Sequence, residues 1–209
     1  MRIPWLILTV FSLIFPFFSH EALAYFSTMD TGEVLDSGHY RVLAEPQFIS
    51  NPSGFNFTGG MDAPLTESMN IRALLGVGSV NFHSALLLKW IPFPDFDQQP
   101  AIGLITGIGW ARYDSESYLS FRGGPIISKK FETDIGLITP YVATPFAVVS
   151  GPGDNTFPFF LEAGGEWRPE GLENLRFLTE IGLNLNEAFN YVSFGVLLYF
   201  DEEKGIEFK

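Results

Sequence analysis

A histidine and a serine stand side by side in the stretch NFHSALLLKW, and they are the clearest candidates for chemistry in the chain. Histidine can act as the base that activates a serine hydroxyl for hydrolysis. The stretch lies in a segment that we expect to form a β-strand, so His83 and Ser84 should point to opposite faces. Without a bulge the two side chains cannot cooperate, and we expect His83 to be an interior histidine paired with a carboxylate.

The two acidic residues in PFPDFDQQP are the next candidates, because carboxylates can bind a hard cation. Asp95 and Asp97 have no further acids at suitable spacing, and the surrounding prolines favour a solvated turn. The chain contains no cysteine, which excludes thiolate metal sites and disulfides. The glycines of IGLITGIGW fit the wall of a sheet better than a phosphate-binding loop. We therefore expect no catalytic residue, no metal, no cofactor and no enzymatic activity.

The composition of the 209 residues favours many short strands joined by turns. Aromatic residues make up 16% of the chain and charged residues 17%, with 21 glycines and 14 prolines. The net charge of −12 argues against nucleic acid as a partner, because phosphates would be repelled.

The first 24 residues have the pattern of a secretory signal peptide. Arg2 precedes an apolar stretch over residues 3–18, and the segment closes with Ala22-Leu23-Ala24, small residues at the spacing of a signal-peptidase site. We expect cleavage after Ala24 and export of the mature chain. Residues 25–37 then form an N-terminal segment, which we expect to lie in the periplasm.

Several later segments alternate with a period of two residues. In YVSFGVLLYF one face is wholly apolar, and the other is smaller and mixed. In FFLEAGGEWR and NLRFLTEIGLN the second face instead carries glycine and charge. A soluble sandwich would bury the apolar face, whereas a membrane barrel turns it towards lipid and lines its interior with the polar face.

Two further features favour the membrane barrel. Trp90, Trp110 and Trp167 all lie near predicted strand ends, where aromatic rings meet the membrane interface. The predicted inner faces combine glycine with charges of both signs, which a narrow lumen needs for room and for mutual pairing. The predicted lumen charges are Arg41, Glu45, Arg72, Arg122, Glu162, Glu166, Arg176 and Glu180.

Ten segments are long enough to cross a membrane as tilted strands, which predicts an all-β, antiparallel transmembrane β-barrel over residues 38–200 with short loops. Eight or twelve strands are the alternatives, and residues 201–209 form a charged tail. The predicted strands are 38–49, 54–61, 69–78, 80–91, 101–113, 117–129, 135–149, 156–168, 174–184 and 189–200.

The last predicted strand carries Ser193, Gly195, Leu198 and Phe200 in the order polar, glycine, large apolar and aromatic. This order resembles the C-terminal assembly signal of bacterial outer-membrane β-barrel proteins, with leucine in place of one aromatic and nine residues after the last one. The resemblance implies location in the outer membrane of a Gram-negative cell. It also implies that outer-membrane lipids, periplasmic chaperones and the barrel assembly machinery are partners of a monomeric barrel.

The hypothesis that follows is a structural or narrow passive-pore role, with paired lumen charges that block most solute flow. Two alternatives stay open at this stage. One is an exported soluble β-barrel that binds an apolar ligand. The other is a lipid-modifying outer-membrane enzyme, which the geometry of His83 and Ser84 weakens.

Overall fold

The computed structural model describes residues 27–50, 53–172 and 174–202. The predicted signal peptide and residues 203–209 of the predicted tail lie outside the described residues. The described strands are β1 (His39–Ser50), β2 (Gly54–Thr66), β3 (Met69–Gly78), β4 (Phe82–Phe93), β5 (Ala101–Tyr113), β6 (Glu116–Ser128), β7 (Phe131–Thr133), β8 (Gly136–Ala143), β9 (Phe146–Ser150), β10 (Phe159–Arg168), β11 (Leu175–Asn186) and β12 (Asn190–Asp201). Among these residues, no helix is long and apolar enough to cross a membrane.

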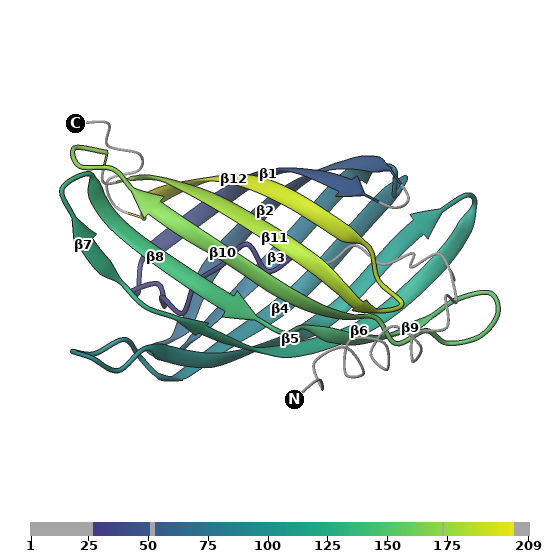
Figure 1. Ribbon diagram of the computed structural model, residues 1–209, viewed down its shortest axis with the longest axis horizontal. Coiled ribbons are helices and arrows are strands. Elements are labelled where there is room, and N and C mark those ends of the chain that lie inside the picture. The colour runs from purple at the N-terminus through teal and green to yellow at the C-terminus, as the bar shows by residue number, and fades with distance from the viewer. Residues whose placement is uncertain (1–26, 51–52, 173, 203–209) are drawn as a thin grey trace, which may run out of the picture.

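The strands form one closed antiparallel barrel with a strongly tilted wall (Figure 1). From β1 to β6, and again from β10 to β12, each strand pairs with the next one in the sequence, and β12 closes the ring by pairing with β1. β8 and β9 together make one position in the wall, because both pair with β6 on one side and with β10 on the other. β7 only extends a hairpin with β8. The wall of the barrel therefore has ten strand positions, and the predicted transmembrane β-barrel is confirmed.

The wall is interrupted where Thr144 and Pro145 separate β8 from β9. Proline has no N–H to donate to a neighbouring strand, so the ladder cannot continue through Pro145. A Cβ on Gly124 of β6 would lie 2.6 Å from Pro145 Cα. Glycine at position 124 therefore allows the two backbones to approach closely at this break.

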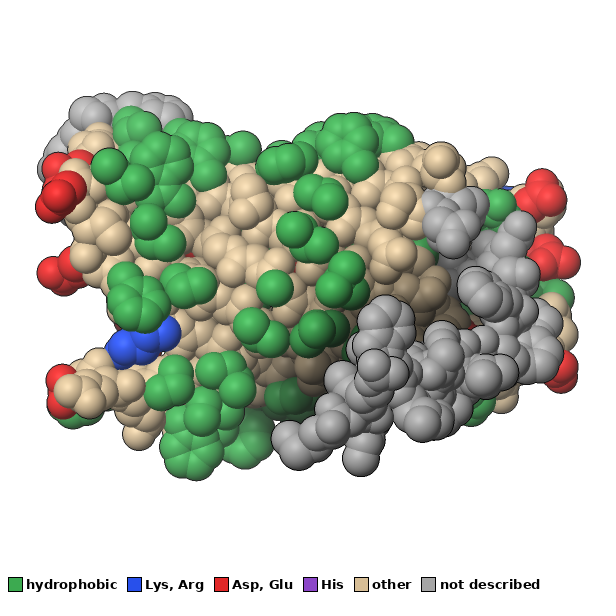
Figure 2. Space-filling model, in the orientation of Figure 1, with side chains coloured by type: hydrophobic (Ala, Val, Ile, Leu, Met, Phe, Trp, Pro, Cys, Tyr) green, Lys and Arg blue, Asp and Glu red, His purple; other side chains and the backbone are tan. Residues whose placement is uncertain are grey.

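On the face shown in Figure 2, hydrophobic side chains are spread along the wall, and acidic side chains lie at its two ends. Ile181 on β11 and Phe194 on β12 are 51% and 49% exposed, whereas Leu197 is fully buried. Ile181 and Phe194 belong to the apolar faces that a membrane barrel turns towards lipid, and Leu197 belongs to the opposite face of its strand. A surface of this kind needs lipid or detergent to cover it.

The barrel has two ends, which we distinguish by where the chain begins and finishes its circuit. At the terminal end His39 of β1 pairs with Asp201 of β12. The distal end holds the β1–β2, β3–β4 and β5–β6 connections. Trp90 and Trp167 are exposed near the terminal end and Trp110 near the distal end, as expected for aromatic side chains at the two edges of an apolar band.

Candidate functional site

The interior of the barrel holds all eight charged side chains that the alternation pattern predicts. Each is at most 6% exposed. Charges at this depth cost free energy unless they are paired or hydrogen-bonded. Their partners therefore decide what the lumen can do.

The N-terminal segment supplies much of this pairing, because residues 27–35, called the plug here, lie inside the barrel. Met29 and Thr31 are fully buried, and Asp30 is 3% exposed. Residues 25–37 were expected to lie in the periplasm, whereas the structure places residues 27–35 inside the lumen. The physical reason is that the inner wall satisfies both the main chain and the acidic side chains of this segment.

An apolar contact holds the plug in the middle of the lumen. Met29 packs in one buried cluster with leucines from five strands of the wall, among them Leu43 and Leu178. A Cβ on Gly195 would come within 2.5 Å of Met29 Cε. Glycine at this position of β12 therefore makes room for the plug.

Opposite walls hold the main chain of the plug through its own polar groups. Glu180 on β11 accepts hydrogen bonds from the backbone N–H groups of Thr28 and Met29, at 3.1 and 2.8 Å. Arg72 on β3 donates to the carbonyl oxygens of the same two residues, at 2.9 and 3.2 Å. The plug is thus fixed between an acidic group and a basic group, although it pairs with no strand.

The side chain of Asp30 lies among three cations of the wall, Arg41, Arg72 and Lys89, called the basic cluster here. Its carboxylate is 2.5 Å from Arg41, 3.2 Å from Arg72 and 2.9 Å from Lys89. Asp62 on β2 also pairs with both arginines, because its two carboxylate oxygens lie 2.6 Å from Arg41 Nε and from Arg72 Nε. A residue of the plug therefore pairs with three cations that come from three different strands of the wall.

A second group of contacts lies closer to the terminal end. Glu33 pairs with Arg176 and with Lys130, and Arg176 also pairs with Glu166 at 2.7 Å. The backbone N–H of Gly32 donates to Ser128 Oγ on β6 at 2.9 Å. The plug is therefore attached to several strands around the barrel.

Two of the predicted glutamates, Glu162 and Glu180, accept hydrogen bonds from tyrosine hydroxyl groups. Tyr191 donates towards Glu162 at 2.6 Å and lies 2.7 Å from Glu180, and Tyr141 donates to Glu180 at 2.6 Å. Glu45 accepts a hydrogen bond from Ser27 of the plug at 3.0 Å. Among the eight predicted charges, Arg176 and Glu166 form an ion pair with each other.

Four charged residues of this arrangement escaped the sequence analysis, namely Asp30, Glu33, Asp62 and Lys89. Asp62 was missed because the second strand was expected to stop at Met61, whereas β2 continues to Thr66. Lys89 lies two and six residues from the inward Leu87 and His83, so the period of two could have identified it. Asp30 and Glu33 lie outside any strand and gave no periodic signal.

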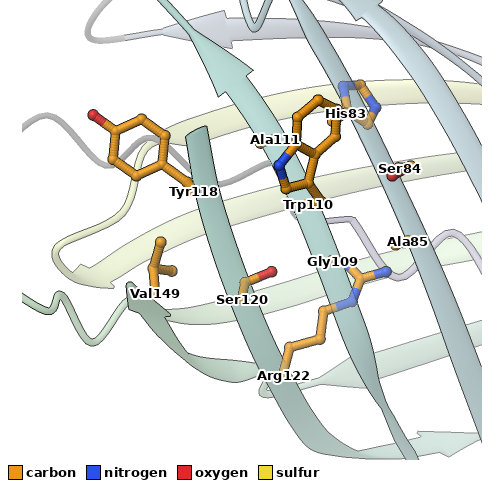
Figure 3. A pocket seen from close by; sticks show the side chains of 10 residues that line it. All are labelled: His83, Ser84, Ala85, Gly109, Trp110, Ala111, Tyr118, Ser120, Arg122 and Val149. Carbon is orange, nitrogen blue, oxygen red and sulfur yellow. The ribbon is translucent and has the colours of Figure 1, made fainter. Parts of the chain in front are cut away.

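A small pocket on the inner wall of β4, β5 and β6 lies on the distal side of the plug (Figure 3). His83 Nε2 is 3.0 Å from Thr58 Oγ1, so this contact of the histidine is with a hydroxyl group, whereas a carboxylate partner was expected. The pocket volume of about 20 Å³ is enough for one water molecule. His83 is buried and Ser84 partly exposed on the other face, as their adjacent positions predict.

Asp95 and Asp97 lie in the β4–β5 turn, where the carboxylate of Asp95 binds nitrogen donors. Lys129 Nζ is 2.5 Å from it, and the backbone N–H of Lys130 donates at 2.7 Å. Partial burial opposes ionisation, but these hydrogen bonds outweigh it and hold the pKa of Asp95 below its usual value. Within the described ranges, no three His, Asp or Glu side chains are placed to hold a metal ion.

Comparisons with known proteins support the fold alone. No protein-family model and no curated protein matches the sequence. An outer-membrane channel from Pseudomonas putida F1 is 9% identical, with a TM-score of 0.52 over 80% of this chain and 97% of that one. A de novo designed transmembrane β-barrel is 16% identical with a TM-score of 0.41, over 80% of this chain and 99% of the design. The N-terminal barrel of Pseudomonas aeruginosa OprF is 13% identical with a TM-score of 0.36, over 78% and 98% of the two chains.

Proposed function

We propose that this protein is an integral outer-membrane β-barrel of a Gram-negative bacterium that acts as a narrow passive pore, closed at rest by its N-terminal plug. The observation that carries the proposal is the position of residues 27–35 inside the lumen, where they are bound by several strands. A purely structural barrel would need only a filled interior. A separate segment held by polar contacts can fill the lumen and still be withdrawn from it.

The outer surface supports the membrane part of this proposal over the soluble alternative. Large apolar side chains such as Phe57, Phe121 and Ile181 are about half exposed on the wall, where a soluble barrel would carry polar groups. We expect outer-membrane lipids as neighbours and the barrel assembly machinery and periplasmic chaperones as assembly partners. Cell fractionation tests the location, because a soluble protein would appear in the aqueous periplasmic fraction. The lipid-modifying alternative is not favoured, because His83 and Ser84 lie on opposite faces.

A reversible disulfide between plug and wall tests the gating. A Cβ on Gly32 would lie 2.9 Å from Ser128 Oγ but also 2.5 Å from Ala101 Cβ, so the variant and its reduced control both carry Ala101→Gly to make room; the natural chain has no cysteine. We expect the Gly32→Cys/Ser128→Cys variant in planar bilayers to lose its small, intermittent openings when oxidised and to regain them on reduction. Deletion of residues 27–35 should give a larger and steadier conductance.

A matched disulfide controls for the effects of oxidation on the barrel. A Cβ on Gly54 would lie 2.6 Å from Ser79 Oγ and 2.9 Å from Ser79 Cβ, at the distal end and away from the plug, so the turn after β3 must move by about 0.6 Å to reach the Cβ–Cβ separation of a disulfide. The Gly54→Cys/Ser79→Cys variant should conduct equally in both redox states. A large steady conductance in the unmodified protein would contradict the closed pore. Unchanged conductance after deletion of the plug would leave only a structural role.

A further inference from the structure

We infer that the basic cluster of Arg41, Arg72 and Lys89 is a carboxylate-binding site of the lumen. In the structure the side-chain carboxylate of Asp30, from the same chain, occupies this site. This inference rests on the proposed function, because an external ligand reaches the site only when the plug is displaced. It adds to that function a class of solute, namely small molecules that carry a carboxylate.

The geometry of the site is that of carboxylate recognition from several directions. Asp30 Oδ1 accepts hydrogen bonds from Arg41 Nη2 at 2.5 Å and from Lys89 Nζ at 2.9 Å. Asp30 Oδ2 lies 3.2 Å from Arg72 Nη2. The backbone N–H of Thr31 also donates to Oδ1 at 2.8 Å. All three cationic side chains are at most 5% exposed. Hydrogen bonds of this charge-assisted kind are among the strongest that proteins make.

The net positive charge of the wall at the basic cluster also favours the binding of an anion there. Three cations face one carboxylate of the wall, Asp62, which leaves two positive charges when Asp30 is absent. Asp62 contacts the two arginines, whereas Lys89 donates to three oxygen atoms of the plug, on Asp30, Thr31 and Glu33. Buried cations without a counter-charge are costly, so withdrawal of the plug leaves a site that favours an incoming anion.

The site is closed to external ligands in the intact protein because Asp30 is covalently part of the same chain. A carboxylate on the same chain acts at a high effective concentration, against which a free monocarboxylate competes poorly. Removal of the Asp30 carboxylate alone should therefore uncover the site while the rest of the plug stays in place. This allows binding to be measured without any measurement of conductance.

Chemical rescue of the Asp30→Ala variant by acetate tests the inference. In detergent at constant ionic strength, we expect acetate to raise the thermal unfolding temperature of this variant in a saturable manner. Acetamide, which has nearly the same shape without the charge, should have no effect. Wild-type protein and the Asp30→Asn variant should not respond, because their own side chains fill the site. The Asp30→Ala/Lys89→Met variant should bind acetate at least tenfold more weakly.

Refolding gives a second readout if Asp30→Ala fails to assemble in cells. The yield of folded protein on dilution from urea into detergent should then rise with acetate and not with acetamide. Equal effects of acetate and acetamide would overturn the site, and equal effects of acetate and chloride would overturn its carboxylate preference. Because neither readout depends on conductance, a failed rescue is distinguishable from a failed pore, which the disulfide experiment detects on its own.

Discussion

Glu180 Oε2 accepts a hydrogen bond from the backbone N–H of Met29 at 2.8 Å, so a carboxylate of the wall holds the main chain of the plug. The sequence predicted Glu180 as one of a set of lumen charges that pair with each other. In the structure its partners are the two N–H groups of the plug and the hydroxyl groups of Tyr141 and Tyr191. Acids of the wall thus retain the plug and do not only neutralise cations of the wall.

We expect Glu180→Ala to loosen the plug. Each buried backbone N–H that loses its acceptor costs about 1–3 kcal/mol unless the plug moves out to meet water. A glutamate-specific protease should then cleave after Glu33 in the folded barrel, and mass spectrometry would detect the product. Tyr141→Phe is the control, because it removes a hydrogen bond to Glu180 but leaves both plug contacts. Protection of Glu33 in the alanine variant would show that Glu180 does not retain the plug.

Charge on the lipid-facing wall should be costly. Ile181→Arg and Phe194→Arg each place a cation where an apolar side chain is half exposed, and each should destabilise the barrel by about 2–4 kcal/mol if near the midplane. Unfolding by denaturant in liposomes measures this cost. Leu65→Arg is the matched control, because Leu65 is 55% exposed near the end of β2, where the cost should be about 0–1 kcal/mol. Equal effects at all three positions would contradict the depth dependence.

The wall of the barrel could be predicted from the sequence far better than the contents of its lumen. The period of two fixes both the strand and the direction of each side chain, so residues such as Ile181 and Leu197 were placed correctly. The plug has no such period, because residues 27–35 are held by partners on strands far apart in the sequence. The acids that pair with Arg41 and Arg72 were absent from the predicted set for this reason, since Asp30 lies in the plug and Asp62 just beyond the expected end of its strand.

The assembly signal in β12 stays a prediction, and the structure provides a sharper test of it. Phe200 stacks on Tyr40 of β1 with ring centroids 5.6 Å apart, so Phe200→Ala removes both a signal residue and a packing contact. Tyr40→Ala removes the same stacking and leaves the signal intact. We expect Phe200→Ala to lower the amount of protein assembled in the outer membrane more than Tyr40→Ala does. Equal loss in the two variants would assign the effect to packing.

Gly195 has a structural role besides its place in the signal. A Cβ at this position would lie 2.5 Å from the flexible end of Met29, 3.2 Å from Leu43 Cδ1 and 3.4 Å from Leu178 Cβ, so Gly195→Ala should be tolerated by the fold if Met29 moves aside. We expect Gly195→Asp to impair assembly more strongly, because it buries a charge among apolar side chains. The folded fraction in isolated outer membranes measures both effects. Impaired assembly of Gly195→Ala with Met29→Ala present, where space is restored, would favour the signal over packing.

The Asp95 contact should make the terminal end sensitive to acid. Its lowered pKa means that Asp95 stabilises the fold at pH values above the ordinary aspartate value of about 3.9, and that this stabilisation is lost as the pH falls towards the folded-state pKa. Thermal unfolding between about pH 2 and pH 5 should show a smaller acid-induced loss for Asp95→Asn than for wild type. Asp97→Asn is the control, because asparagine also tolerates the positive φ of 51° found at Asp97. Identical pH profiles of Asp95→Asn and wild type would contradict the linkage.

Loss of two of the arginines that hold the plug, Arg72 and Arg176, should open the pore and set its ion selectivity. Arg72 binds two carbonyl oxygens of the plug and Asp62, and Arg176 binds Glu33 and Glu166. The double variant Arg72→Met/Arg176→Met releases the plug at both points and leaves the acids of the wall in place. We expect a higher conductance in planar bilayers and a reversal potential shifted towards cations, because carboxylates then outnumber the remaining cations of the lumen.

Matched variants separate this effect from a general loss of stability. Arg112→Met removes an arginine that is exposed near the distal end and should leave conductance unchanged. Deletion of residues 27–35 keeps Arg72 and Arg176, so it should raise conductance without the same preference for cations. If the double variant and the deletion showed equal selectivity, the arginines would only hold the plug and would not set the charge of the open lumen.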